Sequence, residues 1–244
     1  MIRVEDIRPI HLGHYTMPED SRFPGEKVVV RAYVIHHPEK LVLFDTGIAV
    51  GHEEAERIYA PILRRSLPEA LGSVGVSLDD VGAVANCHFH LDHCGGNPLF
   101  PGRPIFAQAR EQQAAAEGGL DYMLPHLFDF DGVVLELHEG EADIVPGLRI
   151  IPTPGHTPGH QSVLVETQHG RILLAGQAVN TASDFARAHY AWQLRQAGSE
   201  EDLPDLPEWM ATVQDLDIRR VLFAHDLLSW DPPAPPISVS YREA

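Results

Sequence analysis

Cysteine is scarce in this sequence, and its scarcity excludes one class of fold. The chain has two cysteines among 244 residues, which is too few for a disulfide-stabilised scaffold. They are Cys87 and Cys94, and their spacing fits neither a disulfide framework nor a cysteine-type zinc site. Both are therefore predicted to be buried, reduced thiols.

Long apolar runs are missing as well. No stretch of about 18 apolar residues occurs. The opening residues, MIRVEDIRPI, lack both the basic start and the apolar segment of a secretion signal. The sequence therefore predicts a cytoplasmic protein with no membrane partner.

Positive charge is in short supply. Eighteen lysine and arginine residues stand against 35 aspartate and glutamate residues, which gives a formal net charge of −17. No cluster of basic residues interrupts this excess, so the chain would repel a phosphate backbone and no nucleic acid partner is expected. We interpret the charge as favouring solubility. The length and the 44% hydrophobic content are those of a globular protein, and one domain over residues 1–244 is expected.

Apolar and β-branched segments indicate two successive β-rich halves. Helices are expected at residues 53–65, 109–117 and 206–216. The residues up to Gly25 have few periodic apolar positions and are expected to form an irregular surface segment. Two packed sheets with helices outside follow from this order of elements. The predicted strands are residues 27–36, 41–44, 81–85, 104–107, 133–137, 148–152, 161–166, 171–175 and 221–224.

Histidine, by contrast, is concentrated in one short stretch. Residues 86–97 read NCHFHLDHCGGN and follow directly on the apolar run Val81–Ala85. Imidazole and carboxylate groups are good ligands for divalent first-row metals. Residues two apart in an extended chain project to the same side, so His88 and His90 can hold one ion while Asp92 and His93 face a second.

The pattern HFHLDH resembles the H-x-H-x-D-H signature of the metallo-β-lactamase superfamily, and the family's other motifs follow in order. Residues 45–47, DTG, are similar to its D-T-G turn, and residues 155–160, GHTPGH, to its G-H-T-x-G-H loop. His225, after the apolar run 221–224, is similar to its last metal ligand. The resemblance covers most of the chain. It implies an α+β fold, an αββα sandwich of two mixed β-sheets with helices on the outer faces.

The resemblance also implies a set of metal ligands. His88, His90 and His156 would hold one metal ion, while Asp92, His93 and His225 would hold a second. Zinc is the expected ion, with one or two ions per chain and with Mn²⁺ or Fe²⁺ as alternatives. Two further residues are expected near the ligands. Asp45 either supports the metal loop by hydrogen bonding or caps a turn, and His160 is expected beside the ligands.

Gln177 departs from the family pattern. After the strand and glycine at residues 172–176, the family normally carries an aspartate whose carboxylate bridges the two ions. A carboxamide is neutral and offers a single carbonyl oxygen. Asp92 is then the only anionic protein ligand among the seven candidates, and Asp92 and Gln177 are expected to act at the reaction centre. Gln177 is predicted either as a weak metal ligand or as a hydrogen-bond donor beside the metal.

The function implied by the resemblance is hydrolysis of a small lactone or another carboxylic ester by a metal-bound hydroxide. The chain looks nearest to N-acyl homoserine lactone lactonases. Those enzymes usually carry a tyrosine where this chain has Asn180, and the candidate substrate-binding residues are Asn180, Phe185 and Tyr190. A glyoxalase II-like thioesterase is one alternative, and a non-catalytic metal- or ligand-binding protein with a degenerate site is another. A homodimer is compatible with the resemblance.

Overall fold

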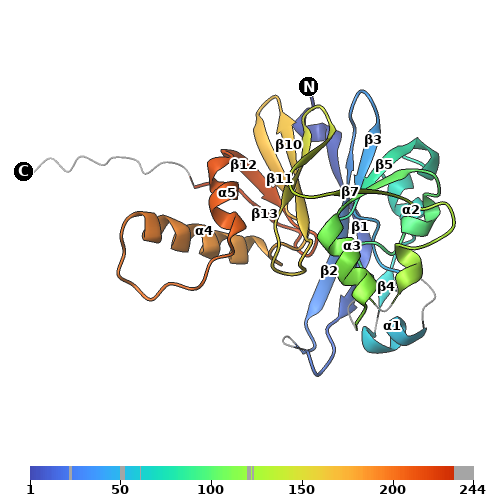
Figure 1. Ribbon diagram of the computed structural model, residues 1–244, viewed down its shortest axis with the longest axis horizontal. Helices are drawn as coiled ribbons and strands as arrows, with labels where there is room; N and C mark the ends of the chain where they lie inside the picture. Colours follow the sequence, from blue (N-terminus) through green and yellow to red (C-terminus); the bar gives the residue numbers. More distant parts are fainter. Residues whose placement is uncertain (22–23, 50–52, 61, 120–121, 123, 234–244) are drawn as a thin grey trace, which may run out of the picture.

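Two β-sheets packed face to face form the centre of the computed structural model, and helices cover their outer sides (Figure 1). The structure describes residues 1–21, 24–49, 53–60, 62–119, 122 and 124–233. Helices α4 and α5 lie on one side of the pair of sheets, and α1, α2 and α3 lie on the other (Figure 1). The expected αββα sandwich is therefore confirmed.

The first sheet is the larger one, with seven strands among the described residues. Strands β3, β5, β6 and β7 run parallel to one another, so their carboxyl ends meet at one edge of the sheet. The loop that follows β5 and carries the histidines begins at that edge. In spatial order the strands are β4 (Leu63–Arg64), β1 (Ile7–Thr16), β2 (Lys27–Ile35), β3 (Leu41–Phe44), β5 (Val81–Ala85), β6 (Pro104–Gln108) and β7 (Val134–His138).

The second sheet has six strands in the described part of the chain. All of its neighbouring strands pair antiparallel except β11 and β12, which are parallel. In spatial order they are β13 (Ser229–Trp230), β12 (Ile218–Leu222), β11 (Gly170–Leu174), β10 (Gln161–Thr167), β9 (Leu148–Pro152) and β8 (Ala142–Val145).

Apart from α4, the helices of the described residues are short, and local capping fixes the start of two helices. Ser66 begins α2 with a reciprocal capping box to Glu69, and the Thr181 hydroxyl accepts the Asp184 N–H at the start of α4. Such caps contribute about 1 kcal/mol each. No helix within the described residues is long and apolar enough to cross a membrane. The helices are α1 (Glu53–Ile58), α2 (Leu67–Gly72), α3 (Ala109–Glu117), α4 (Ala182–Gln196) and α5 (Trp209–Asp215).

The central strands are apolar on both faces because each face packs against a different layer. On β2, Tyr33 and Ile35 face the second sheet, whereas Ala32 and Val34 belong to the cluster beneath the outer helices. On β11, Leu173 likewise packs on the outer side, among residues of α4 and α5. Alternation of side chains along a strand produces this division. It explains why these strands read as continuous apolar runs.

Two sequence-based expectations about secondary structure were wrong. Within the segment before Gly25, residues Ile7–Thr16 are not irregular, because they form β1 and pair with β2. A bulge between His11 and Gly13 interrupts the alternation of β1, which hides its strand pattern. The helix expected over residues 53–65 ends at Ile58, since Leu63 pairs with β1 instead.

Candidate metal centre

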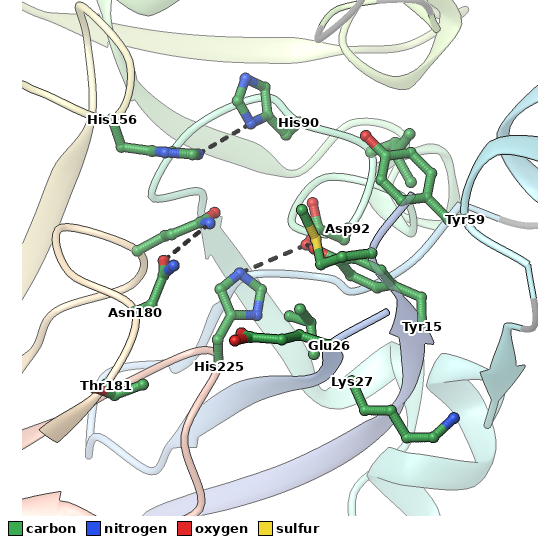
Figure 2. Close-up of a pocket in the computed structure, with 14 residues that line it drawn as sticks. Tyr15, Glu26, Lys27, Tyr59, His90, Asp92, His156, Asn180, Thr181 and His225 are labelled. Atoms are coloured by element: carbon green, nitrogen blue, oxygen red, sulfur yellow. Dashed lines mark hydrogen bonds and ion pairs between the residues drawn. The ribbon is translucent and has the colours of Figure 1, made fainter. Parts of the chain in front are cut away.

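Six potential metal ligands meet where the loops after three strands converge. His88, His90, Asp92 and His93 follow β5, while His156 follows β9 and His225 follows β12. Figure 2 shows His90 and His156 facing each other, with Asp92 and His225 beside them. We call these six residues the ligand cluster. The folding of the two sheets thus unites residues that are up to 137 positions apart, from His88 to His225.

The first group in the cluster consists of His88, His90 and His156. Their nearest ligand atoms lie within 4.8 Å of one another, and His156 Nε2 lies 3.1 Å from His90 Nδ1. His88 is fully buried, and its Nε2 has no hydrogen-bond partner. An unsatisfied buried polar group costs about 1–3 kcal/mol. Its position among other imidazoles fits a nitrogen whose partner is a metal ion.

The second group consists of Asp92, His93 and His225. His93 Nε2 lies 3.1 Å from His225 Nε2 and 3.5 Å from Asp92 Oδ2. The Nδ1 atoms of both histidines point outward, one to Asp45 Oδ2 at 2.9 Å and the other to the Val29 carbonyl at 2.8 Å. Outward Nδ1–H donation leaves each Nε2 lone pair facing inward, as in histidines that ligate metals. A divalent cation between these atoms fits the donor set.

Burial sets the protonation of most of the cluster. It lowers the pKa of His90 to about 3 and that of His156 to about 4. It lowers the pKa of His88 well below the ordinary range. These imidazoles are neutral at pH 7, which is the form that binds a metal.

His93 has the opposite charge state. Burial alone would lower its pKa, but the carboxylates of Asp92 and Asp45 outweigh burial and raise the pKa to about 9. For Asp92, burial would raise the pKa, yet His93 and His225 bring it down to about 2. The metal-free protein thus holds a positive His93 beside a negative Asp92.

Asp45 supports the cluster from beneath. It is buried, with φ of 65°, and its two oxygens accept hydrogen bonds from the Cys87 N–H at 2.8 Å and from His93 Nδ1 at 2.9 Å. This confirms that Asp45 supports the metal loop by hydrogen bonding. Cys87 and Cys94 are both buried and free, as predicted.

The Gln177 side chain is oriented by neighbours on both sides. Its Oε1 lies 3.1 Å from His93 Nε2, and its Nε2 donates to Asn180 Oδ1 at 3.2 Å. Its backbone N–H donates to His160 Nε2 at 3.1 Å, and His160 lies outside the ligand cluster. The carbonyl oxygen of Gln177 therefore faces the second group of ligands, while its amide nitrogen faces Asn180.

A cavity of about 250 Å³ opens beside the cluster. Tyr15 enters it from β1, and its hydroxyl donates to Asp92 Oδ2 at 3.1 Å. Burial, and then the Asp92 charge, raise the pKa of Tyr15, so its phenol keeps the proton that it donates. The walls are formed by ligands and by other side chains, namely Tyr15, Met17, Glu26, Lys27, Val28, Tyr59, His90, Leu91, Asp92, His156, Gln177, Asn180, Thr181 and His225.

Comparison with known proteins identifies the family. The model of the metallo-beta-lactamase superfamily matches residues 25–225. The chain belongs to this superfamily. Its lactonase-type relatives include the N-acyl homoserine lactonase AiiA of Bacillus thuringiensis subsp. kurstaki, which is 35% identical over 179 residues, covering 66% of this chain and 69% of the relative. The N-acyl homoserine lactonase AttM of Rhizobium radiobacter is 30% identical over 170 residues, covering 61% of this chain and 64% of the relative.

Solved structures of lactonases share the fold. A quorum-quenching N-acyl homoserine lactone lactonase superposes with a TM-score of 0.70 at 25% identity, with 93% of each chain covered. AidC, a dizinc quorum-quenching lactonase, superposes with a TM-score of 0.65 at 15% identity, with 95% of each chain covered. The resemblance inferred from the motifs is confirmed.

Two of the three residues expected to bind substrate lie away from the cavity. Phe185 is buried in α4 and packs against Trp230 and Phe223, with ring centroids 4.8 and 6.1 Å away, so it is part of the core. Tyr190 is 62% exposed on the same helix and does not line the cavity. The reason is that α4 turns one face to the second sheet and the other to solvent. Only Asn180, which precedes α4, lies at the cavity.

Sequence reasoning missed Glu111, a buried carboxylate at the start of α3. Its Oε1 accepts the Phe89 N–H at 2.9 Å, and its Oε2 accepts the Thr157 hydroxyl at 2.6 Å and the Gly159 N–H at 3.2 Å. Glu111 thereby ties the loop that carries His88 and His90 to the loop that carries His156. The neighbouring residues in the sequence are arginine, glutamine and alanine, and this composition does not indicate a buried carboxylate.

Proposed function

We propose that this protein is a metal-dependent hydrolase that cleaves a small lactone or another carboxylic ester. The observation that carries the proposal is the convergence of five imidazoles and one carboxylate beside a cavity of about 250 Å³. Relatives named as N-acyl homoserine lactonases support the reaction class.

The two groups of ligands would each hold one zinc ion. His88, His90 and His156 would bind the first, while Asp92, His93 and His225 would bind the second. Zinc bound there would lower the pKa of water from about 15.7 to about 7, and so supply a hydroxide, and would polarise the ester carbonyl. Asp45 and the Val29 carbonyl would hold the His93 and His225 rings in the required orientation.

The cavity walls would orient the substrate. Met17, Val28 and Leu91 offer apolar surface suited to an acyl group, while Asn180 and Thr181 offer polar groups on another part of the lining. We expect an ester bound there to turn its carbonyl toward the ligand cluster, because His90, Asp92, His156 and His225 line the same cavity. Positioning of this kind lowers the barrier because the reacting atoms are already aligned.

Gln177 would act as a neutral neighbour or weak ligand of the second ion. Its carbonyl oxygen faces His93 Nε2, and Asn180 holds its amide nitrogen away from that atom. The centre would then have one protein anion, Asp92, to balance the charge of the bound metal. A more electron-poor metal follows, which favours ionisation of water but weakens metal retention.

The test is turnover of a panel of lactones, esters and thioesters by protein loaded with Zn²⁺ or Mn²⁺. We expect lactone or ester hydrolysis that is abolished in His88→Ala and retained in His169→Ala, a matched change at an exposed histidine in the β10–β11 turn. Metal content per chain is measured in parallel by elemental analysis.

Other outcomes of the panel would refute the proposal in different ways. Turnover confined to thioesters would point to a glyoxalase II-like reaction. No turnover by metal-replete protein would indicate a protein that binds a metal or ligand without catalysis. Full activity in His88→Ala would show that the reaction does not use the ligand cluster.

A further inference from the structure

Tyr15 contacts the one carboxylate in the ligand cluster at its metal-facing oxygen. The hydroxyl donates to Asp92 Oδ2 at 3.1 Å. The same oxygen is the one nearest the other two ligands of its group, 3.5 Å from His93 Nε2 and 3.6 Å from His225 Nε2. The hydrogen bond therefore acts on the atom that would meet the metal (Figure 2).

A bulge in β1 directs the Tyr15 side chain toward Asp92. Leu12 and Tyr15 are three positions apart, yet both are buried in the same cluster, which regular alternation does not allow. The bulge between His11 and Gly13 supplies the extra residue. Gly13 has φ of 135°, and a Cβ there would lie 2.1 Å from the Leu63 carbonyl oxygen, so only glycine fits the bulge.

Neighbouring elements hold the Tyr15 ring in place. Tyr15 pairs with Val28 on β2, and its ring meets the Tyr59 ring edge-on, with centroids 5.1 Å apart. Only 7% of Tyr15 is exposed. The phenol is thus a fixed donor, whereas the Asp92 side chain has two rotatable bonds.

We infer that Tyr15 is a positioning residue that fixes Asp92 for the metal held by Asp92, His93 and His225. The inference rests on the proposed metal-binding function of that group. The Tyr15 hydrogen bond matters more in this chain than it would beside two carboxylates, because Gln177 leaves Asp92 as the one carboxylate in the ligand cluster. Losing an outer partner of a metal ligand typically lowers metal affinity by about 10- to 100-fold.

The test is a Zn²⁺ titration of metal-free wild type, Tyr15→Phe and Tyr33→Phe. Tyr33 is the matched control because its buried hydroxyl also makes one hydrogen bond, to the Phe223 carbonyl at 2.7 Å. Among the described residues, this hydroxyl forms no hydrogen bond to the ligand cluster. We expect Tyr15→Phe to weaken one of the two binding events about 10- to 100-fold and to leave the other unchanged. Tyr33→Phe should lose stability without that loss of affinity. Wild-type affinity in Tyr15→Phe would overturn the inference.

A second background separates positioning from a general loss of packing. In Gln177→Asp a second carboxylate is present, so adding Tyr15→Phe should lower zinc affinity by a smaller factor than it does in wild type. An equal factor in both backgrounds would refute the dependence on a single anionic ligand. Co²⁺ absorption reports the ligand geometry without turnover, and the visible band should change in Tyr15→Phe. Because no substrate is used, a failure of the proposed hydrolysis leaves this result interpretable.

Discussion

Zinc binding at Asp92, His93 and His225 is expected to release one proton and to weaken steeply as the pH falls. Burial lowers the pKa of His93, but Asp92 and Asp45 outweigh it and raise that pKa to about 9. The metal-free protein therefore holds a protonated His93 at neutral pH, and Nε2 must lose its proton before it can bind zinc. His90, whose pKa burial lowers to about 3, is already neutral.

The size of the effect follows from the pKa. At about pH 6, deprotonating a group whose pKa is about 9 costs about 4 kcal/mol, since each pH unit is worth about 1.4 kcal/mol. Zinc affinity at this group should thus be roughly a thousandfold lower at about pH 6 than above the pKa of His93. The group of His88, His90 and His156 should show almost no such dependence between about pH 5 and 8.

The assay is calorimetric titration of zinc in buffers of different ionisation enthalpy, which counts the protons released. At about pH 6 few water molecules on zinc are ionised, so their protons contribute little. We expect close to one proton for the second group and close to none for the first. Asp45→Asn removes one source of the high His93 pKa, so zinc affinity should reach its upper plateau at a lower pH than in wild type. Two bound ions with no proton released at this pH would refute the reasoning.

Three further results are expected. Gln177→Asp adds a carboxylate beside His93 Nε2 and should tighten zinc binding at least about tenfold; unchanged affinity in a zinc titration would place residue 177 away from the metal. Glu111→Gln removes a charge that accepts four hydrogen bonds, so the free energy of unfolding should fall by about 2 kcal/mol, measured by urea denaturation. In the metal-free protein, the lowered pKa values of His90 and His156 should reduce stability as the pH falls below about 6.5, because protons then bind the unfolded chain preferentially. The raised pKa of His93 should add stability that is present below about pH 6.5 and lost as the pH rises through about 9; a denaturation series that is flat in both ranges would contradict these two signs.

The parts of the site that could be predicted from sequence are those encoded by contiguous residues. His88, His90, Asp92 and His93 lie in one loop after a buried strand, so their common direction follows from the backbone. The ligands from other segments, such as His156 and His225, were predicted only from motifs of the family. Most strands could be predicted from apolar runs, because the inner strands are buried on both faces.

Features that depend on long-range packing could not be predicted. Tyr15 reaches Asp92 only because a bulge changes the face on which the end of β1 projects. Glu111 is buried by two loops that are distant in sequence, one at Phe89 and the other at Thr157. Phe185 was expected to bind substrate, but it packs among residues of the second sheet and α5, and its own segment of sequence does not encode that contact.

The two departures from the lactonase pattern, at Gln177 and Asn180, are physically coupled. The Gln177 amide nitrogen donates to Asn180 Oδ1 at 3.2 Å, and this bond turns the Gln177 carbonyl toward His93. A carboxylate at position 177 would have no N–H to donate. The Asn180 side-chain amide can instead rotate so that its NH2 group donates to the carboxylate. The His160 ring would still accept the backbone N–H of residue 177. Gln177→Asp should therefore fit without a second substitution, because the hydrogen-bonding groups that would hold a carboxylate are already in place.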